Sequence, residues 1–598
     1  MKHSFFSLIA TVMFATAPVS GVSVSGGDGV YNDGRIAYAP VKLTEAEKQI
    51  IAPSVEAGHK RYEPEYRMTA TDISGWQYHM DAQSGHYHDV RGSFSYAGTL
   101  LDYDDPQYRQ RAFDIIEKTI SLQETNPASP YCGVWPYFEE EPVATKKTPV
   151  DFNWADFNAV SLLDIYTGHR DELPQDLRKK IEDALILAAK SIQRRNVHPN
   201  YTNIAIMGTY VTYMVSHLFN LPEMQEYAQK KLKTFYDWTR EKNGFSEYNS
   251  PTYTITAIDE LNRMQRHIVE PEAKRMIDEL YATGWTMIAR HYHKPTAQWT
   301  GPQSRSYGSL VGGAFYGLLY QASDGKIDIP GRNEYPDVKI RHRIPENLLP
   351  YFLNPQYPRC EKDVFENSDP QITGTSYLTG KYALSTSSVS SLWNQRRPFL
   401  AYWGTPEKPS YLQVRLLHDL YDFSAAIWFG AQKDNTVLAA INFAPDGGDR
   451  HLYLSPLDNG KFMAKDLRLR FEFGNTGAGV LAVPKTSHAP VDFTIDGLRF
   501  HVQLYYGVFE KFEGHWETGG DGKTAWMDYV IYTGDETEID LTGIDTAALG
   551  FAFALASDGD RIPAGKAAGE VRNGILSAEW NGLKVSAPVK PENRPRNF

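Results

Sequence analysis

Four segments of the chain combine asparagine, tyrosine, histidine, arginine and tryptophan at short spacing. One of them, EYNSPTY at residues 247–253, places two tyrosines and an asparagine around a proline, between two stretches of helical periodicity. The four segments supply these candidate side chains: Trp76, His86, His88, His198, Asn203, Tyr248, Asn249, Tyr253, His293, Trp299, Gln303, Arg305 and Tyr307. Such groups can donate hydrogen bonds to an anion and can move a proton, so they predict acid–base chemistry on an acidic substrate.

These residue types suit the removal of a proton from the carbon next to a carboxylate, with expulsion of a neighbouring oxygen. The amide of Asn203 and the guanidinium of Arg305 would neutralise the carboxylate and stabilise the charge that develops. Tyr253 would act as base or acid, and His198 or His293 would share the proton transfer or bind the carboxylate. Nearby cations would bring the pKa of the phenol from about 10 toward the working pH.

Aromatic residues are abundant, with 37 Tyr, 28 Phe and 12 Trp. Flat rings often line carbohydrate clefts, although large cores also contain many of them. Trp76, Trp299 and Tyr307 would pack on sugars, and the other candidates would bind the substrate. The predicted partner is therefore a polysaccharide or oligosaccharide that contains a uronic acid.

Each candidate also has a structural interpretation. Asn203 stands at the start of a predicted helix and could cap it. Arg305 could pair with a carboxylate such as Glu247, and Tyr253 could pack its helix against a neighbour. Tyr248 could serve only in loop packing.

Two other functional classes fit parts of the sequence. A glycoside hydrolase on the same helical scaffold would need two carboxylates beside the scissile bond, for which the candidates are Asp151, Asp156, Glu247 and Asp259. A secreted glycan-binding protein without catalysis would need neither set. Carboxylates crowding the cleft would favour hydrolysis, whereas Asn, Tyr, His and Arg would favour elimination.

No cofactor is predicted. The pattern His86-Tyr-His88 could begin a site for a structural divalent cation, but further ligands at a recognisable spacing are missing from the sequence. The two cysteines, Cys132 and Cys360, are far apart and could either pair or remain free thiols.

The helical pattern extends from about residue 40 to residue 325 and comes in pairs, with apolar residues three and four apart. Thr44 is a candidate N-cap, and Asp105 followed by Pro106 marks a second helix start. Successive pairs indicate a curved helical array. Such an array would gather the polar connecting segments on one rim of a central cleft.

After about residue 335 the pattern changes to short, aromatic and β-branched runs that often alternate and are separated by turn signals. Runs of strands after runs of helices predict two domains. The predicted boundaries are a helical catalytic domain at 30–335, a linker at 336–370 rich in Pro, Arg and Lys, and an antiparallel β-sandwich at 371–590.

The first 22 residues have a basic Lys2, a short apolar run and small residues, which is typical of a secretory signal peptide. No later run of about 18 apolar residues predicts a membrane span, so we expect a secreted or periplasmic protein. The formal net charge of −12 argues against a nucleic-acid partner. An anionic ligand must therefore meet a locally positive site.

Paired helices followed by an all-β half, with Asn, Tyr, His and Arg on the helical connections, resemble the polysaccharide lyases built as an incomplete (α/α) toroid plus an antiparallel β-sandwich. The resemblance is carried by NYTN around Asn203, EYNSPTY around Tyr253, QSRSY around Arg305, and the sandwich entry SYLTGKYALSTSS followed by LWNQRRP. It implies cleavage of a uronate glycan by β-elimination, with action on rhamnose-glucuronate ends as the preferred specificity. It also implies that sandwich residues such as Tyr377, Asn394 or Arg396 reach the cleft.

Overall fold

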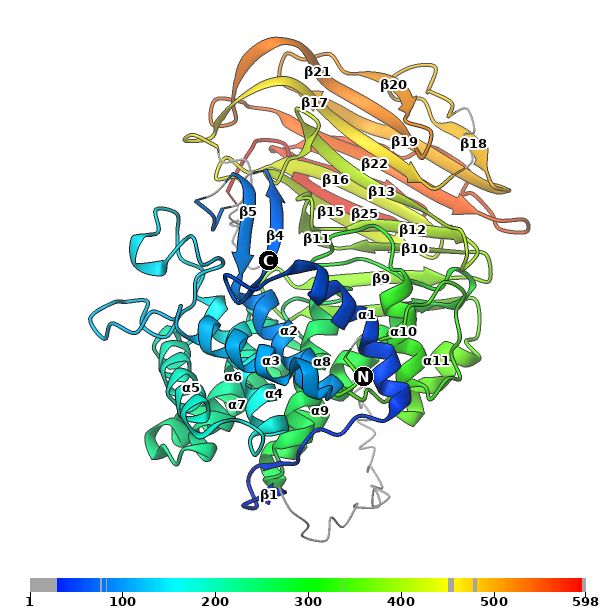
Figure 1. Cartoon of the computed structure of the whole chain (residues 1–598). Coiled ribbons are helices and arrows are strands. Elements are labelled where there is room, and N and C mark those ends of the chain that lie inside the picture. The colour runs from blue at the N-terminus through cyan, green and yellow to red at the C-terminus, as the bar shows by residue number, and fades with distance from the viewer. Residues whose placement is uncertain are drawn as a thin grey trace, which may run out of the picture.

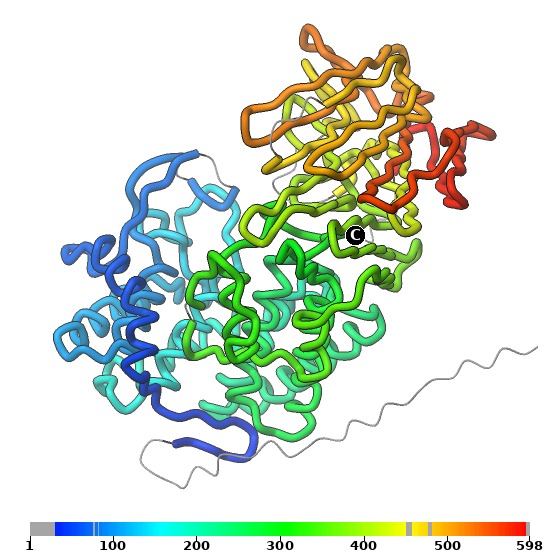
Figure 2. The backbone as a smooth tube through the Cα atoms, turned by 90° about the vertical axis from the view of Figure 1, so that its right-hand side faces the viewer, coloured from blue at the N-terminus to red at the C-terminus, as the bar shows by residue number. Residues whose placement is uncertain are grey.

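The computed structural model describes residues 30–75, 78–81, 83–335, 337–449, 457–476 and 481–593. It confirms the predicted architecture, because an incomplete toroid of paired helices is followed by antiparallel β-sheets (Figure 1). Figure 2 shows the sheets stacked as a second body against one end of the helical half. The predicted signal peptide at 1–22 and the candidate Trp76 lie outside the described residues.

The toroid consists of antiparallel pairs, each with one inner and one outer helix. The inner helices, which contact one another in succession, are α2 (Val90–Tyr103), α4 (Asn153–His169), α6 (Thr202–Leu218) and α8 (Tyr253–His267). The outer helices are α3 (Pro106–Ile120), α5 (Gln175–Arg195), α7 (Pro222–Lys242) and α9 (Pro271–His291). Helix α6 is buried on nearly all sides, and its sequence is correspondingly apolar, whereas α5 and α7 bury one face and expose a charged one.

Local sequence signals define several helix starts, as predicted. Thr44 caps α1 (Glu45–Arg61) in a reciprocal capping box with Glu47. Asp105 caps α3, and Pro106 occupies its first turn. Two further helices, α10 (Gly313–Ala322) and α11 (Leu349–Leu353), complete the helical half within the described residues.

Short strands interrupt the helical half, and the helical periodicity gave no sign of them. They are β1 (Tyr31–Asn32) with β2 (Ala37–Tyr38), β3 (Tyr62–Glu63) with β4 (Met68–Ser74) and β5 (Ser84–Asp89), and β6 (Tyr292–His293) with β7 (Gln298–Trp299). The β4–β5 hairpin rises from the toroid toward the large sheets (Figure 1).

Within the described residues, three stacked antiparallel sheets form the β half. The largest sheet contains, in spatial order, β20 (His515–Gly520), β21 (Thr524–Asp540), β17 (Lys461–Gly474), β13 (Pro409–His418), β12 (Phe399–Gly404), β10 (Tyr382–Ser387), β9 (Ile372–Leu378) and β8 (Arg359–Glu366), with β14 (Tyr421–Asp422) beside β13. The middle sheet contains β11 (Val389–Ser391), β15 (Ala426–Lys433), β16 (Thr436–Phe443), β22 (Ala547–Ala556), β19 (Leu498–Phe509) and β18 (Val491–Ile495). The outermost contains β23 (Ala568–Arg572), β24 (Ile575–Trp580) and β25 (Leu583–Pro588).

The middle sheet is buried on both faces. Along β16, Val437 and Ala439 pack toward the largest sheet, whereas Leu438 and Ala440 pack toward the outermost one. Because successive side chains of a strand point to opposite faces, a strand between two cores must be apolar at every position. This requirement explains the apolar run at residues 437–441 of β16 and the longer run of β22.

The two halves are joined by many polar contacts. Arg290 of α9 bonds to Glu361 at 2.8 Å, and the Nε2 atom of His291 lies 3.1 Å from Asp363 on the first large-sheet strand. The hydroxyl of Tyr402 donates to the carbonyl of Ser309 at 2.7 Å. The sheets therefore brace the end of the toroid at which the inner helices begin.

Candidate active site

All four inner helices begin at the same end of the toroid, because an outer helix returns the chain between each of them. We call this end the rim and the opposite end the base. Helices α4, α6 and α8 have no side-chain hydrogen bond from their N-cap residues. Converging helix N-termini carry partial positive charge, so the rim favours an anion despite the negative net charge of the chain.

Arg305 is the centre of the cluster at the rim. Its Nη2 atom donates to the phenol oxygen of Tyr253 at 3.0 Å, and its Nη1 atom lies 3.2 Å from the Glu247 carboxylate. Its Nε and Nη2 atoms also donate to the side-chain oxygen of Gln395, at 2.9 and 2.8 Å. The guanidinium packs over the rings of Tyr253 and Trp393. The predicted pairing of Arg305 with Glu247 is thus present together with its contact to Tyr253.

The phenol of Tyr253 bonds to a second tyrosine. Its oxygen lies 2.6 Å from the hydroxyl of Tyr307, whose side chain is 65% exposed. Burial raises the pKa of Tyr253, and the nearby cation of Arg305 only partly opposes this effect. The expectation that cations lower this pKa was therefore wrong, because desolvation of the phenolate outweighs the attraction of one guanidinium.

Asn203 lies in the first turn of α6, beside Glu247. The N-cap of this helix is Tyr201, and Asn203 does not cap it, so the capping interpretation does not hold. Asn203 is only 4% exposed, and among the described residues its side-chain oxygen has no hydrogen-bond partner. Its backbone N–H is directed at the Glu247 carboxyl group, so the two residues are neighbours.

Aromatic and amide side chains continue the site toward α4. Asn153 donates to the phenol oxygen of Tyr201 at 3.2 Å, and the charges of Glu247 and Arg305 both act on that phenol. Further along, the rings of Tyr137 and Trp154 stack with centroids 3.8 Å apart. These residues give the rim flat surfaces on which sugars can pack.

A cation accompanies these rings at the start of α2. The guanidinium of Arg91 lies 4.0 Å from the centroid of Phe157, and the residue is exposed to solvent. A cation is therefore accessible beside these aromatic rings.

Four predicted substrate-binding residues are buried and must be corrected. Trp299 is fully buried and donates its indole N–H to Asn249, which is also fully buried. Gln303 is buried and donates to the Trp299 carbonyl, and Tyr248 stacks on Phe365. Trp299 and Asn249 have no accessible surface and cannot touch a sugar, and the polar group of Gln303 and the ring of Tyr248 are engaged inside the protein. These residues instead hold the segments that carry Tyr253 and Arg305 in place.

The predicted catalytic histidines do not join the cluster. His293 is fully buried and bonds to Thr296 and to the Thr379 carbonyl, and burial lowers its pKa to about 4. His198 is exposed, bonds to Asn200 and packs against the ring of Trp238 on the outer side of the helices. Neither ring contacts Tyr253 or Arg305 in the described structure, so a proton-transfer role for them has no geometric support.

The pair His86 and His88 belongs to a chain of carboxylates on the β4–β5 hairpin. His86 bonds to Asp72 and Glu63, both at 2.7 Å, and His88 bonds to Glu63 at 3.0 Å and to Glu140 at 2.5 Å. Neither histidine contacts the cluster around Arg305. Among the described residues, no group of three or more His, Cys, Asp or Glu side chains is arranged to hold a metal ion.

The two cysteines remain unpaired, with Cys132 buried and Cys360 exposed. No helix in the described part of the chain combines the length and the apolar character needed to cross a membrane.

The functional cluster includes side chains that the sequence interpretation did not single out for the site. Gln395 and Trp393 come from the β half, close to the predicted Asn394 and Arg396. Tyr201 lies in the same motif as Asn203. Its adjacency to an expected site residue was the available signal, whereas nothing local indicated that Gln395 would reach Arg305.

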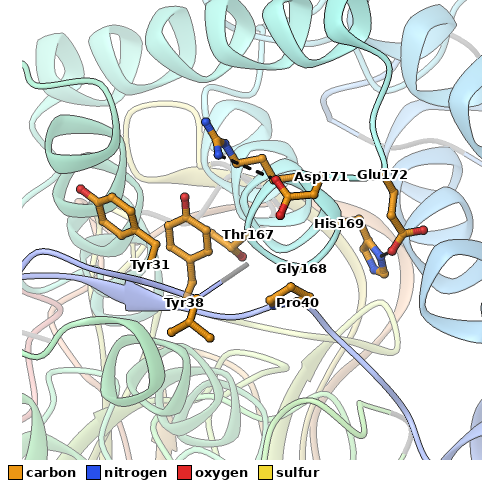
Figure 3. A pocket seen from close by; sticks show the side chains of 10 residues that line it. Tyr31, Tyr38, Pro40, Thr167, Gly168, His169, Asp171 and Glu172 are labelled. Atoms are coloured by element: carbon orange, nitrogen blue, oxygen red, sulfur yellow. Dashed lines mark hydrogen bonds and ion pairs between the residues drawn. The ribbon is translucent and has the colours of Figure 1, made fainter. Parts of the chain in front are cut away.

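A cavity lies at the base of the toroid, far from the rim. It has a volume of about 300 Å³ and is lined by Val30, Tyr31, Tyr38, Pro40 and residues 167–172 (Figure 3). The rings of Tyr31 and Tyr38 stack with centroids 5.0 Å apart. This cavity contains none of the predicted site residues.

Comparisons with known proteins give a family match and distant structural similarities. Residues 55–314 match the model of a family described as a domain of unknown function (DUF8769). No curated protein matches the sequence. The chain is similar to the chondroitin AC lyase of Streptomyces coelicolor A3, at 9% identity and a TM-score of 0.44, over 90% of this chain and 85% of that chain.

Two further solved structures are also similar to this chain. The heparan sulfate lyase HepC of Pedobacter heparinus has 10% identity and a TM-score of 0.35, over 94% of this chain and 91% of that chain. The endoglucanase CelQ of Clostridium thermocellum has 11% identity and a TM-score of 0.22, over 80% and 72% respectively. All these TM-scores are below 0.5, so a functional assignment depends on the geometry of the site itself.

Proposed function

We propose that this protein is a secreted polysaccharide lyase that cleaves a uronate-containing glycan by β-elimination. The observation that carries the proposal is the contact of Arg305 with the Tyr253 phenol, beside the amide of Asn203 at the uncapped start of α6. A proton carrier and a carboxylate-binding group thus share one site.

The substrate carboxylate would bind at the start of α6. The side-chain NH₂ of Asn203 would donate to it, and the positive end of the helix would stabilise it further. Removal of the adjacent C5 proton spreads negative charge onto the carboxylate group, so interactions there strengthen in the transition state. They therefore accelerate the reaction as well as supporting binding.

Tyr253 would move the proton. Its raised pKa keeps the phenol protonated, so the proton must leave before the oxygen can accept one from C5. The short bond to the exposed Tyr307 provides a path to solvent, and Arg305 stabilises the phenolate. As the C4–O bond breaks, the same phenol would return the proton to the leaving oxygen.

The substrate is a uronate glycan whose sugars pack on the aromatic surface around Tyr137 and Trp154. Within this class we propose action on rhamnose-glucuronate chain ends, from which an exo-acting enzyme would release an unsaturated uronate. The N-terminal segment supports export of the protein to the periplasm or beyond.

One observation favours a second candidate, a glycoside hydrolase. Burial raises the pKa of Glu247 to about 7, as expected of a general acid. A partner carboxylate would have to come from Asp151, which already accepts a hydrogen bond from Tyr137 at 2.7 Å, or from Asp156, which is buried in α4 and lies 3.8 Å from Arg195. Asp259 is excluded from this role because it bonds to His342 and Tyr335, away from the cluster.

The two functions are separated by the products formed from a panel of uronate polysaccharides, including rhamnose-capped arabinogalactan. Elimination creates a conjugated unsaturated uronate, which absorbs in the ultraviolet. We expect this absorbance to rise with the wild type and not with Tyr253→Phe. New reducing ends without absorbance would refute the lyase and support the hydrolase, and release of unchanged ligand would refute both.

A further inference from the structure

Two buried side-chain oxygens at the rim lack a hydrogen-bond donor among the described residues. Within the described structure, neither the Oδ1 atom of Asn203 nor the Oε2 atom of Glu247 has a hydrogen-bond partner. Both side chains are less than 10% exposed, and the backbone N–H of Asn203 is directed at the Glu247 carboxyl group. A buried acceptor without a donor costs about 1–3 kcal/mol, so such a pair in adjacent residues requires an explanation.

A single proton on Glu247 would satisfy both oxygens, if the carboxyl group donates it to the amide oxygen of its neighbour Asn203. A protonated carboxyl group has one O–H donor, and Asn203 Oδ1 is an acceptor. The other carboxyl oxygen, Oε1, remains free to accept from Arg305 at 3.2 Å. With its oxygen held in this way, the amide of Asn203 must turn its NH₂ group away from Glu247.

We propose that Glu247 in its neutral form is a positioning residue, which donates a hydrogen bond to Asn203 and thereby aims the Asn203 NH₂ group at the substrate carboxylate. The inference rests on the proposed lyase function and deepens it. Glu247 itself touches neither the substrate nor the transferred proton. Its role is to select one of the two orientations of an amide.

The charges around Glu247 are compatible with a neutral form. Burial is the largest influence and raises its pKa to about 7, against the opposing effects of Arg305, the Asn203 N–H and Arg396. Arg396 is held at 2.9 Å by Asp449, which reduces its pull on Glu247. The other titratable groups that act with it are the phenols of Tyr253 and Tyr201, both with raised pKa values and therefore uncharged.

Loss of the proton reverses the orientation. An ionised Glu247 only accepts hydrogen bonds, so it attracts the NH₂ group of Asn203 and leaves the amide oxygen on the side where the substrate carboxylate would bind. An oxygen repels the substrate carboxylate. Substrate affinity is therefore expected to fall as the pH rises through about 7.

The test uses Glu247→Gln and Glu247→Leu in the full chain. A glutamine is the permanent equivalent of the neutral acid, since its NH₂ donates to Asn203 and its oxygen accepts from Arg305. At pH 6 we expect Glu247→Gln to keep kcat/KM within about threefold of the wild type and to lose the fall above pH 7. Glu247→Leu should lower kcat/KM by about tenfold or more at every pH. Equal losses in both variants, or an unchanged fall in Glu247→Gln, would overturn the proposal.

A matched control addresses other buried acids. Glu260 is also buried, with a pKa raised to about 7, but it pairs with Arg263 at 3.4 Å and contacts neither Asn203 nor Arg305 in the described structure. Glu260→Gln should retain the fall in kcat/KM above pH 7. If it abolished that fall, the assignment to Glu247 would be wrong.

A double-variant cycle tests whether Glu247 acts through Asn203. In an Asn203→Ala background there is no amide to orient, so Glu247→Leu should have no further effect on kcat/KM. A purely structural role would instead give additive losses, and additivity would overturn the proposal.

Binding measured without turnover separates this proposal from the lyase function. Calorimetric titration with a uronate oligosaccharide should show weaker binding at pH 8 than at pH 6 for the wild type, but not for Glu247→Gln. This pattern would support the orientation role even if no unsaturated product formed. Binding that does not depend on pH in either protein would overturn it, even if the lyase function held.

Discussion

At the base of the toroid, Asp102 lies 2.7 Å from the Lys339 ammonium and 2.9 Å from His169, and Asp164 accepts from Arg266 at 2.9 Å. At the rim, by contrast, Glu247 has one oxygen on Arg305 and one without a partner in the described structure. Burial opposes the ionisation of Asp102, but Lys339 and His169 more than offset it and hold its pKa below the usual range. Burial instead raises the pKa of Glu247.

Fully paired buried carboxylates, as at the base, are expected where charges stabilise the fold. An incompletely paired one, as at the rim, is expected where a ligand binds. The base network links the ends of α2, α4 and α8 to the connector at residues 337–343, and each of its carboxylates has a cation in contact. A site must leave groups available for a ligand, so incomplete pairing in a buried position is the more informative sign. If the number of charged residues were the only criterion, the base would have been chosen over the rim as the candidate site.

The largest effect is expected at the rim, from Tyr253→Phe. Loss of the proton carrier should lower kcat by about 10³-fold or more, while the thermal unfolding midpoint stays within a few degrees. The measurement is the initial rate of ultraviolet absorbance. Tyr248→Phe is the matched control, because this phenol lies in the same loop but packs against Phe365, and it should keep nearly full activity. Activity in Tyr253→Phe close to the wild-type level would refute the proposed mechanism.

The corresponding test at the base is Lys339→Met. Removing Lys339 leaves the buried Asp102 with His169 as its remaining partner, so the free energy of unfolding should fall by about 3 kcal/mol, with little change in kcat of the folded enzyme. Urea denaturation provides the measurement. Lys274→Met, which breaks an exposed pair with Asp278, should cost less than about 1 kcal/mol. Equal effects of the two variants would show that the base network is not structural.

A smaller loss of activity is expected at the rim from Asn203→Ala. Loss of one hydrogen-bond donor to the developing charge should lower kcat/KM by about 10²-fold. Asn200→Ala is a close control, because Asn200 belongs to the same motif but is exposed and bonds to His198. Kinetics of the two purified variants at one pH would decide the matter, and equal losses would remove Asn203 from the site.

The two ends should also respond to pH in opposite directions: substrate affinity at the rim should fall as the pH rises, whereas stability at the base should fall as the pH decreases. Because the folded pKa of Asp102 is lowered, its contribution to stability is present above its unfolded pKa of about 3.9 and is lost as the pH falls through its folded value. Urea denaturation between pH 6 and pH 3 should show this loss, with a shallower slope for Asp102→Asn. Identical slopes would mean that Asp102 does not contribute.

The smallest effect is expected for Tyr307→Phe. If the exposed Tyr307 only relays the proton of Tyr253, other routes to solvent remain, and kcat should fall by about tenfold or less. The double variant with Tyr253→Phe should be no worse than Tyr253→Phe alone. Additive losses would indicate an independent role for Tyr307.

Sequence periodicity predicted the fold well because it reflects local requirements. The caps at Thr44 and Asp105, the paired helices and the change to strands follow from short-range chemistry. The third sheet layer was missed, because an apolar strand between two cores has the same sequence as one in a single large core. The β4–β5 hairpin was missed because its residues carry no strong alternation.

For the site, the sequence predicted that Asn203, Tyr253, Arg305 and Tyr307 would lie near one another. It did not predict that residues close to them in sequence are buried. Trp299 and Asn249 have the residue types of a sugar site, yet they bond to each other inside the protein. Burial depends on how two loops fold against each other and against the sheets, which spacing along one chain does not reveal. The histidines were misplaced for the same reason.

The bond between Gln395 and Arg305 has a consequence for how the chain can be divided. The family match ends at residue 314, so it contains the arginine but not the glutamine that orients it. A truncated toroid, or a chimera with a foreign sandwich, would keep every residue that the helical half contributes to the cluster. The Arg305 guanidinium would nevertheless lose its hydrogen bonds to Gln395. The boundary between the two halves therefore passes through the candidate site, and exchanging modules there would separate Gln395 from Arg305.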